Sequence, residues 1–213
     1  VIEVHFQNYN DSDGLPGNQF NENAAYHTKA GELIFGGANG FTVFKPEQLG
    51  VNTFRPQVVL SDFQLFNESI HANEEVDGRV LLTQSITNAP PITLPHDENV
   101  FSIGFSALNY FQPEKSEYKY MLEGFNTDWL STNAKSRTVT FTNLDAGDYT
   151  FRVIASNNDG IWNNVGATMK ITVLPPFWQT PAAFAIYGVV IIVTLIIVRK
   201  IIQQREQMKY AIQ

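Results

Sequence analysis

The feature that most limits what this chain can fold into is an uncharged run near its C-terminal end. Residues 171–198 contain no acidic or basic side chain, and from Ala182 to Val198 nearly every residue is apolar. A bilayer core needs about 20 apolar helical residues, and helix tilt and interfacial aromatic rings accommodate a small shortfall. The run therefore predicts a membrane-spanning helix, which with its linker we place at residues 175–200.

The flanks of this run predict anchors and an orientation. Trp178 and Tyr187 lie towards its N-terminal end, where amphipathic rings suit the headgroup level. Arg199 and Lys200 follow directly, and positive charge beside a span favours the cytoplasmic side. We expect a single crossing, with residues before about 178 in the periplasm and the C-terminus in the cytoplasm. A buried core helix is the alternative, although core helices seldom lack a polar face over such a length.

The formal net charge of −7 combines two different environments. Residues 1–198 carry 10 Lys and Arg against 20 Asp and Glu, which gives −10, whereas residues 199–213 carry 4 against 1, which gives +3. The acidic portion argues against nucleic acid as a partner. The chain has no cysteine, which excludes disulfides and thiolate metal sites. Because Val1 opens no signal-peptide pattern and Gln213 lies within a helical pattern, we expect a fragment of a longer protein.

Upstream, the apolar pattern has the period of two that is typical of strands. It covers residues 2–6 and, after a loop rich in Asn, Asp, Gly and Pro, three short pieces at residues 24–28, 32–37 and 40–46. Four short strands in about 45 residues have the size of one propeller blade. We therefore predict that residues 1–49 end a β-propeller. The alternative, which the spacing leaves open, is the edge sheet of one larger sandwich.

A second β-rich block follows a boundary at Pro46–Pro56. Apolar residues alternate in five windows: Val59, Phe63 and Leu65; Phe101, Ile103 and Phe105; Tyr118, Tyr120 and Leu122; Tyr149, Phe151, Val153 and Ala155; Met169, Ile171 and Val173. Strands at this spacing, with no helical window between them, indicate a sandwich. We predict an immunoglobulin- or fibronectin-like β-sandwich over residues 50–174.

The stretch LDAGDYTFRVIASNNDG contains the pattern of a tyrosine corner. Leu144 and Gly147 precede Tyr149, which starts a strand and whose hydroxyl would bond to upstream backbone. We interpret all three residues as structural rather than ligand-binding. Trp129 and Trp162 each follow a turn, and we expect them to lie in the core or cover an end of the sandwich, with a ligand contact at a loop tip as the alternative.

The residue types needed for catalysis are present but not in a catalytic arrangement. No pair among the four histidines has metal-ligand spacing: His5, His27, His71 and His96. Ser106 in GFSAL lacks the second glycine of a nucleophile elbow, and Glu123 and Asp128 flank turn residues, which favours a loop with solvated acids. No Gly-rich phosphate loop occurs. We expect no enzyme activity, metal or cofactor in this stretch.

Three segments resemble the Y-Y-Y domain of hybrid two-component sensors: LNYFQPEKSEYKYMLEGFNTDWLST, TFTNLDAGDYTFRVIASNNDGIWN and ITVLPPFWQT. The upstream DGLPGNQFNENAAYHTKAGELIFGGANGFTVFKPEQL is similar to the last blade of the regulator propeller that precedes this domain. The segments stand in the family's order, with the apolar run where the family has its membrane helix. Phe141 stands where the family has its middle tyrosine, which puts one local hydrogen bond in doubt.

The resemblance implies a bacterial inner-membrane sensor of oligosaccharides, coupled through one helix to a cytoplasmic histidine kinase. It places the glycan mainly on propeller blades outside this chain. We also expect a homodimer formed through the sandwich and the membrane helix. Residues 201–213 keep helix formers, and Ile201 and Met208 are seven apart. We predict that this segment starts a cytoplasmic signalling helix; a short basic helix end that snorkels is the alternative.

A second class of function fits the same architecture. A cell-surface adhesion or scaffold protein would also display a fibronectin-like sandwich on a single-pass anchor. This hypothesis explains the sandwich and the apolar run equally well. It does not explain why helix formers continue beyond the run.

Overall fold

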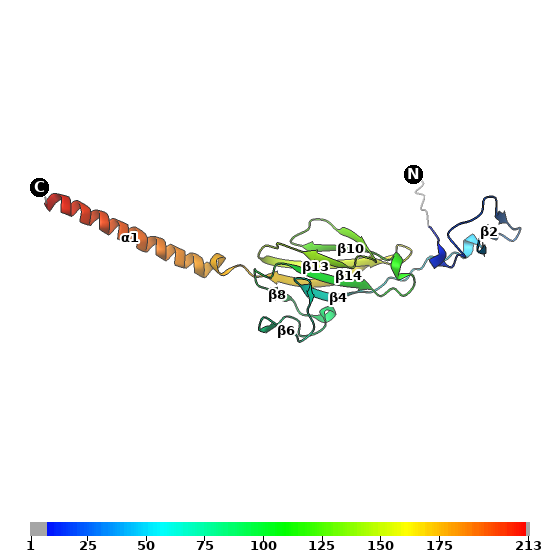
Figure 1. Cartoon of the computed structure of the whole chain (residues 1–213), viewed down its shortest axis with the longest axis horizontal. Coiled ribbons are helices and arrows are strands. Elements are labelled where there is room, and N and C mark those ends of the chain that lie inside the picture. Colours follow the sequence, from blue (N-terminus) through cyan, green and yellow to red (C-terminus); the bar gives the residue numbers. More distant parts are fainter. Residues whose placement is uncertain (1–7, 212–213) are drawn as a thin grey trace.

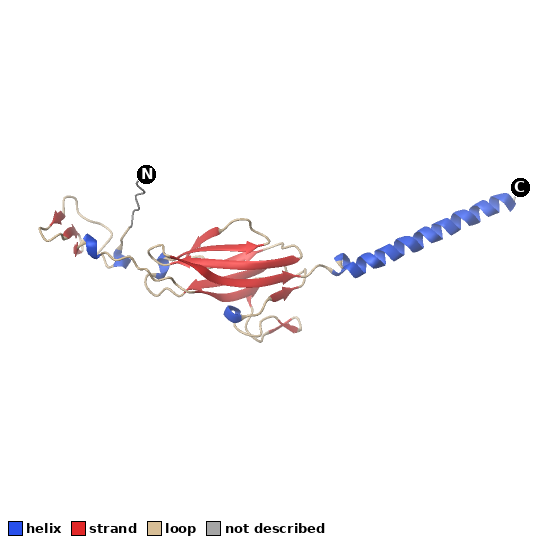
Figure 2. Ribbon diagram, turned by 180° about the vertical axis from the view of Figure 1, so that it is seen from behind, coloured by secondary structure: helices blue, strands red, loops and turns tan. Residues whose placement is uncertain are grey.

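The computed structural model describes residues 8–211, with side chains as far as Arg205. Three parts follow one another along the long axis of the molecule (Figure 1). A small antiparallel sheet lies at the N-terminal end, a two-sheet sandwich lies in the middle, and one long helix leaves the opposite end of the sandwich (Figure 2). The predicted fold class, mainly β with a single C-terminal apolar helix, is confirmed.

The N-terminal sheet is a three-stranded meander in the order β1-β2-β3, with bounds Ala25–His27, Leu33–Gly37 and Gly40–Phe44. A fourth strand predicted at residues 2–6 lies outside the described residues. Phe35 stacks on Phe44 with ring centroids 5.9 Å apart, yet Tyr26 and Phe41 are 65% and 70% exposed. A sheet this small cannot bury both of its faces, and it gains stability from further strands or a packed neighbour.

The first sheet of the sandwich has five strands in the order β11-β10-β13-β14-β8. In that order their bounds are Leu130–Asn133, Glu117–Glu123, Gly147–Ser156, Trp162–Val173 and Ile92–Leu94. Strands β14 and β8 run parallel, and the other neighbours in this sheet run antiparallel.

The second sheet has four strands in the order β12-β9-β4-β5. Their bounds are Thr138–Phe141, Phe101–Ala107, Val58–Leu65 and Glu68–Ser69. A two-stranded hairpin, β6 (Glu75–Val76) with β7 (Arg79–Val80), lies beside the sandwich. It interrupts the interval between β5 and β8, in which no strand was predicted.

The core fills the space between the two sheets with side chains that alternate along each strand. Phe105 of β9 and Phe151 of β13 face each other across the sheets with centroids 6.1 Å apart, and both are essentially inaccessible to solvent. Phe141 packs on the same ring at 6.0 Å, so its lack of a hydroxyl suits an apolar site. Because fully burying one such ring contributes about 1.5–3 kcal/mol, this aromatic cluster is a main source of the stability of the sandwich.

The expected alternation in β4 is wrong at Val59. Val58 and Leu60 are buried and Val59 is only partly buried, whereas Phe63, an odd-numbered residue like Val59, is fully buried. The register shifts between Leu60 and Asp62, where β4 carries a β-bulge against β9. The inserted residue reverses the inward and outward positions along the rest of the strand.

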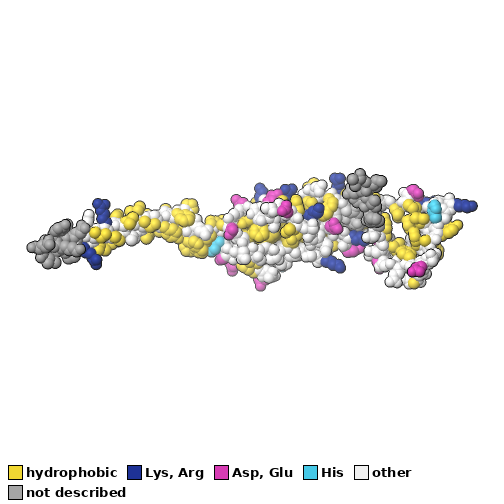
Figure 3. Space-filling view, turned by 90° about the horizontal axis from the view of Figure 1, so that it is seen from above, with side chains coloured by type: hydrophobic (Ala, Val, Ile, Leu, Met, Phe, Trp, Pro, Cys, Tyr) yellow, Lys and Arg dark blue, Asp and Glu magenta, His cyan; other side chains and the backbone are white. Residues whose placement is uncertain are grey.

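Helix α1 spans Pro181–Ala211. It begins after Thr180, whose hydroxyl accepts a hydrogen bond from the Ala183 amide at 3.3 Å, and Pro181 occupies the first helical position, where proline is favoured. Its segment 181–205 has a mean hydropathy of 2.6, and 6% of its most apolar window is buried, so it is long and apolar enough to cross a membrane. Figure 3 shows this apolar surface bare of the sandwich, with Lys and Arg only near its far end. The described residues therefore do not bury this helix in the way that the core-helix alternative requires.

Candidate functional site: two junctions at the ends of the sandwich

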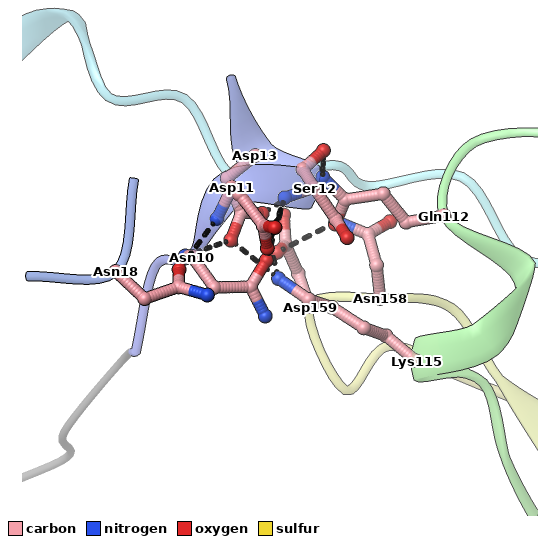
Figure 4. Close-up of polar contacts among 9 residues, drawn as sticks. All are labelled: Asn10, Asp11, Ser12, Asp13, Asn18, Gln112, Lys115, Asn158 and Asp159. Carbon is pink, nitrogen blue, oxygen red and sulfur yellow. Dashed lines mark hydrogen bonds and ion pairs between the residues drawn. The ribbon is translucent and has the colours of Figure 1, made fainter. Parts of the chain in front are cut away.

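The end of the sandwich away from the helix is tied to the N-terminal segment by an ion pair. The Lys115 ammonium lies 2.6 Å from both carboxylate oxygens of Asp13 (Figure 4). The Gln112 amide nitrogen donates to Asp13 Oδ1 at 2.8 Å and to the Ser12 carbonyl at 2.9 Å. Only 11% of the Asp13 side chain and 23% of the Lys115 side chain are exposed. Two segments about a hundred residues apart in sequence thus meet at one point.

Short helical turns hold both partners of this ion pair. Asp13 ends the 3-10 turn Asp11–Asp13, in which Asn10 and Asp13 cap each other, since the Asn10 amide donates to Asp13 Oδ2 at 2.7 Å. Gly14 follows in the left-handed region at φ 92°, which glycine adopts without strain. Lys115 ends a second turn, Pro113–Lys115, with proline at its start. Both charged groups are therefore positioned by local backbone geometry.

The surroundings of Asp13 keep its carboxyl ionised. Partial burial raises its pKa, but hydrogen bonds from Lys115, the Asn10 amide and Gln112, together with the Lys115 charge, lower the pKa below its ordinary value. A charge-assisted pair with additional donors is stronger than an ion pair in open solvent. The contact is therefore formed at neutral pH and weakens in acid.

A second tether fixes the linker between the meander and the sandwich. Asn157, in the turn between β13 and β14, donates to the Asn52 and Phe54 carbonyls and accepts from the amides of Asp159 and Ile161. Asn157 is 1% exposed, and the Asp159 carboxylate accepts from the Asn52 amide at 2.6 Å. The linker is therefore bound along the end of the sandwich.

Sequence reasoning did not identify Asn157 or the Asp13–Lys115 pair. The NNDG tetrapeptide is an Asx-turn signal, which points to the turn but not to the linker that it binds. The spacing of Asp13 and Lys115 carries no local signal at all.

A cleft of about 910 Å³ separates the meander from the sandwich beside these tethers. Aromatic side chains from both sides line it, including Phe35 and Phe44 of the meander and Phe111 of the sandwich, together with Asp13 and Asp159. The two parts therefore meet through polar contacts around an open cleft rather than through a continuous apolar interface. Such an interface permits relative movement of the parts.

The opposite end of the sandwich leads into the helix through a short, stiff connection. After β14 ends at Val173, the Leu174 amide still donates to the Leu94 carbonyl of β8 at 2.8 Å. Pro175 and Pro176 follow, and proline restricts both its own backbone and that of the preceding residue. The 3-10 turn Phe177–Gln179 then leads into α1.

Aromatic contacts brace this connection. The Trp178 ring meets Phe177 edge-on at 5.0 Å and His96 edge-on at 5.2 Å. His96 lies in the loop after β8, so the start of the helical part contacts the sandwich directly. Of the predicted membrane anchors, Trp178 and Tyr187 are 44% and 45% exposed. Arg199 and Lys200 are exposed on α1, and the anchoring role of all four residues stays a prediction.

The residues assigned to the tyrosine corner lie together. The Tyr149 hydroxyl donates to the Asp145 carbonyl at 2.8 Å, and burial together with the Asp145 charge raises the pKa of Tyr149. Leu144 is buried, and a side chain at Gly147 would contact the Tyr149 ring. The contact of the hydroxyl with upstream backbone is the one expected of such a corner.

The two tryptophans lie on the outer face of the five-stranded sheet rather than in the core. Trp129 is 38% exposed, with the Arg152 guanidinium 5.9 Å from its ring centroid. Trp162 is partly buried, with the Lys119 ammonium 4.8 Å from its ring centroid. Phenylalanine and aliphatic side chains fill the core, so the expectation of a core position is wrong for these two rings. A cation lies near each ring, and a role in covering an end of the sandwich stays a prediction.

The residues considered for catalysis remain apart. Glu123 is not in a solvated loop, because it ends β10 and pairs with Arg152 at 2.8 Å. Asp128 is exposed, and Ser106 lies on β9. Within the described part of the chain, no group of three His, Cys, Asp or Glu residues has the arrangement of a metal site.

Comparison with known proteins gives a consistent result. The model of the Y_Y_Y domain matches residues 109–174. Histidine kinase P4 of Formosa agariphila is 31% identical over 203 residues, which is 95% of this chain but only 14% of that protein.

Solved structures show the same similarity. The extracellular domain of a hybrid two-component system from B. thetaiotaomicron matches 78% of this chain and 22% of its own length, with 26% identity and a TM-score of 0.59. The extracellular domain of a one-component system from the same organism matches 75% of this chain and 22% of its own length, with 25% identity and a TM-score of 0.51. Residues 109–174 therefore match the Y_Y_Y domain, and the chain is similar to part of a histidine kinase and to the extracellular domains of two-component and one-component systems.

Proposed function

We propose that this chain relays the binding of a periplasmic ligand to a cytoplasmic histidine kinase through a single membrane helix. The ligand is an oligosaccharide held mainly by propeller blades beyond this chain, the C-terminus lies in the cytoplasm, and the relay works as a homodimer through the sandwich and the helix. The chain spans 14% of the length of the histidine kinase that it resembles. Sensing and kinase activity are therefore proposed for the whole protein.

The same proposal assigns the parts of the chain. Residues 1–49 end a regulator propeller and residues 50–174 form the sandwich domain. Residues 175–200 form the linker and transmembrane helix, and residues 201–213 start the signalling helix. In support, the sandwich strands run from Val58 to Val173 and α1 continues without a break from Pro181 to Ala211.

The observation that carries the proposal is the pair of junctions at opposite ends of the sandwich. At one end Asp13 and Asn52 tie the N-terminal segment to the sandwich through polar contacts beside a cleft. At the other end the last strand continues into α1 through Pro175 and Pro176. The sandwich can therefore act as a rigid body, with a movable polar contact at one end and the stiff proline connection at the other. Such a body transmits a displacement to the helix, whereas a flexible linker of Gly and Ser would not.

Insertions into the helix of the full-length protein test the relay. One residue added after Tyr187 rotates everything beyond it by about 100°, and seven residues restore the phase to within about 20°. We expect ligand-dependent signalling to fail or lock with one inserted residue and to recover largely with seven. Protein level and ligand affinity, measured in parallel, should be unchanged in both variants.

Normal signalling from both insertion variants would refute transmission by helix phase. In that case the helix would serve only as an anchor, and helix phase would not carry the signal. Reporter fusions after Gln213 test the orientation, because the proposal requires a cytoplasmic signal from that position and protease access before Pro175 from the periplasm.

A further inference from the structure

A small polar pocket lies on the outer face of the five-stranded sheet. It has a volume of about 270 Å³ and is lined by Glu117, Tyr118, Ser131, Thr132, Asn133 and Trp162. Strands β10, β11 and β14 supply these residues, so the pocket stands on rigid elements. It is distinct from the larger cleft beside Asp13, because the two share no lining residue.

The register of the sheet places the polar groups of this pocket in cross-strand pairs. Glu117 lies opposite Asn133, and Lys119 lies opposite Ser131 on the same outer face. The Lys119 ammonium is 4.8 Å from the centroid of the Trp162 ring. An indole, a carboxylate, a carboxamide and a hydroxyl therefore converge on one small volume.

The hydrogen-bonding capacity of these groups is largely unused. Within residues 8–205, the Glu117 carboxylate, the Ser131 hydroxyl and the Asn133 amide nitrogen make no hydrogen bond to another protein group. Asn133 Oδ1 accepts from the Lys135 amide at 3.0 Å, which holds the side chain and fixes which end of the amide remains available. The pocket thus offers acceptors and donors to a molecule rich in hydroxyl groups.

We propose that this pocket is a subsite for one neutral pyranose residue. An aromatic face attracts the slightly positive C–H face of a sugar ring, while Glu117 and Asn133 accept from and donate to neighbouring hydroxyls. Glu117 is the one charged residue that lines the pocket, so the site disfavours an anionic ligand. Its volume is below the roughly 300–1,000 Å³ of pockets for drug-sized ligands, which limits it to a single ring.

The subsite deepens the proposed function, because it gives the sandwich itself a contact with a saccharide. It does not depend on helix phase or on the propeller. Failure of the insertion experiment and failure of this inference are therefore distinguishable.

Binding of neutral methyl glycosides to the whole chain tests the inference. The chain is held in a detergent without a sugar headgroup, and methyl glucopyranoside, galactopyranoside and mannopyranoside are titrated by saturation-transfer NMR. We expect at least one to bind with a Kd on the order of 1 mM, as suits a ligand of this size. The charged methyl glucuronide should bind more weakly than the best neutral glycoside.

Variants then locate the binding. Trp162→Ala and Asn133→Ala should each weaken it at least tenfold, whereas the matched control Trp129→Ala, a second outward-facing ring on the same sheet, should leave the Kd within twofold. Asn133 lies on the exposed edge strand β11, so its variant remains informative if Trp162→Ala fails to fold. The proposal is overturned if no neutral glycoside binds, if the glucuronide binds best, or if Asn133→Ala retains full affinity.

Discussion

Replacing Lys115 with alanine should loosen the N-terminal segment from the sandwich without unfolding either part. Lys115 donates to both carboxylate oxygens of Asp13 at 2.6 Å, and the pair is mostly shielded from solvent. A hydrogen bond to a charged group contributes about 1.5–3 kcal/mol. The Asn10 amide and Gln112 still bond to the carboxylate in the variant. We therefore expect the contact between the N-terminal segment and the sandwich to lose about 1.5–2 kcal/mol of its free energy. That corresponds to a roughly 10- to 30-fold shift towards the undocked state.

Native-state hydrogen exchange measures this shift directly. The Asn10 amide is bonded to Asp13, and its protection should fall by roughly tenfold or more in Lys115→Ala. The amides of β13, in the middle of the sandwich, should keep their protection. Lys135→Ala is the matched control, because this lysine is exposed and only its backbone amide makes a hydrogen bond.

The same contact should depend on pH in a defined direction. The pKa of Asp13 is lowered in the folded protein. The stabilisation that the ionised Asp13 gives to the contact is therefore fully present above the ordinary carboxyl pKa of about 4, and it is lost as the pH falls through the lowered pKa. The acid-induced loss of Asn10 protection should be smaller in Lys115→Ala. A double-mutant cycle with Asp13→Asn should show a coupling of about 1–2 kcal/mol. Unchanged protection in Lys115→Ala, or coupling below about 0.5 kcal/mol, would refute the assignment of a docking contact.

Three further substitutions test the sandwich. Tyr149→Phe removes the hydrogen bond to the Asp145 carbonyl and should lower the free energy of unfolding by about 1 kcal/mol in urea titrations. The ligand affinity of the intact sensor should not change. A loss of affinity without a loss of stability would assign Tyr149 to binding. Asn157→Ala leaves several buried groups unpaired and should lower the free energy of unfolding by roughly 2–4 kcal/mol. A change of less than about 0.5 kcal/mol would contradict the role of Asn157 in holding the linker. Gly166→Ala should destabilise the protein at least as much, because φ is 61° and a β-carbon would lie 2.1 Å from the Val153 carbonyl oxygen. A normal melting temperature would contradict this prediction and show that the backbone here relaxes easily.

Features that repeat along the chain could be predicted from the sequence. The uncharged run predicted α1 because a bilayer requires a continuous stretch of apolar residues, and such a stretch can be read directly from the sequence. The alternation at Phe101, Ile103 and Phe105 predicted β9 because inward and outward positions follow directly from the strand period. The Tyr149 hydroxyl reaches backbone only four residues away, so a local motif contains the whole interaction.

The tertiary structure decided what depends on distant partners. Asp13 and Lys115 are 102 residues apart, and no pattern within either segment encodes their distance. The bulge that displaces Val59 depends on pairing with β9, and the outward position of Trp129 depends on how completely other rings fill the core. Local periodicity states which face of an element is apolar, but only the packed fold determines which side chain that face meets, because the contacts that position it come from other elements.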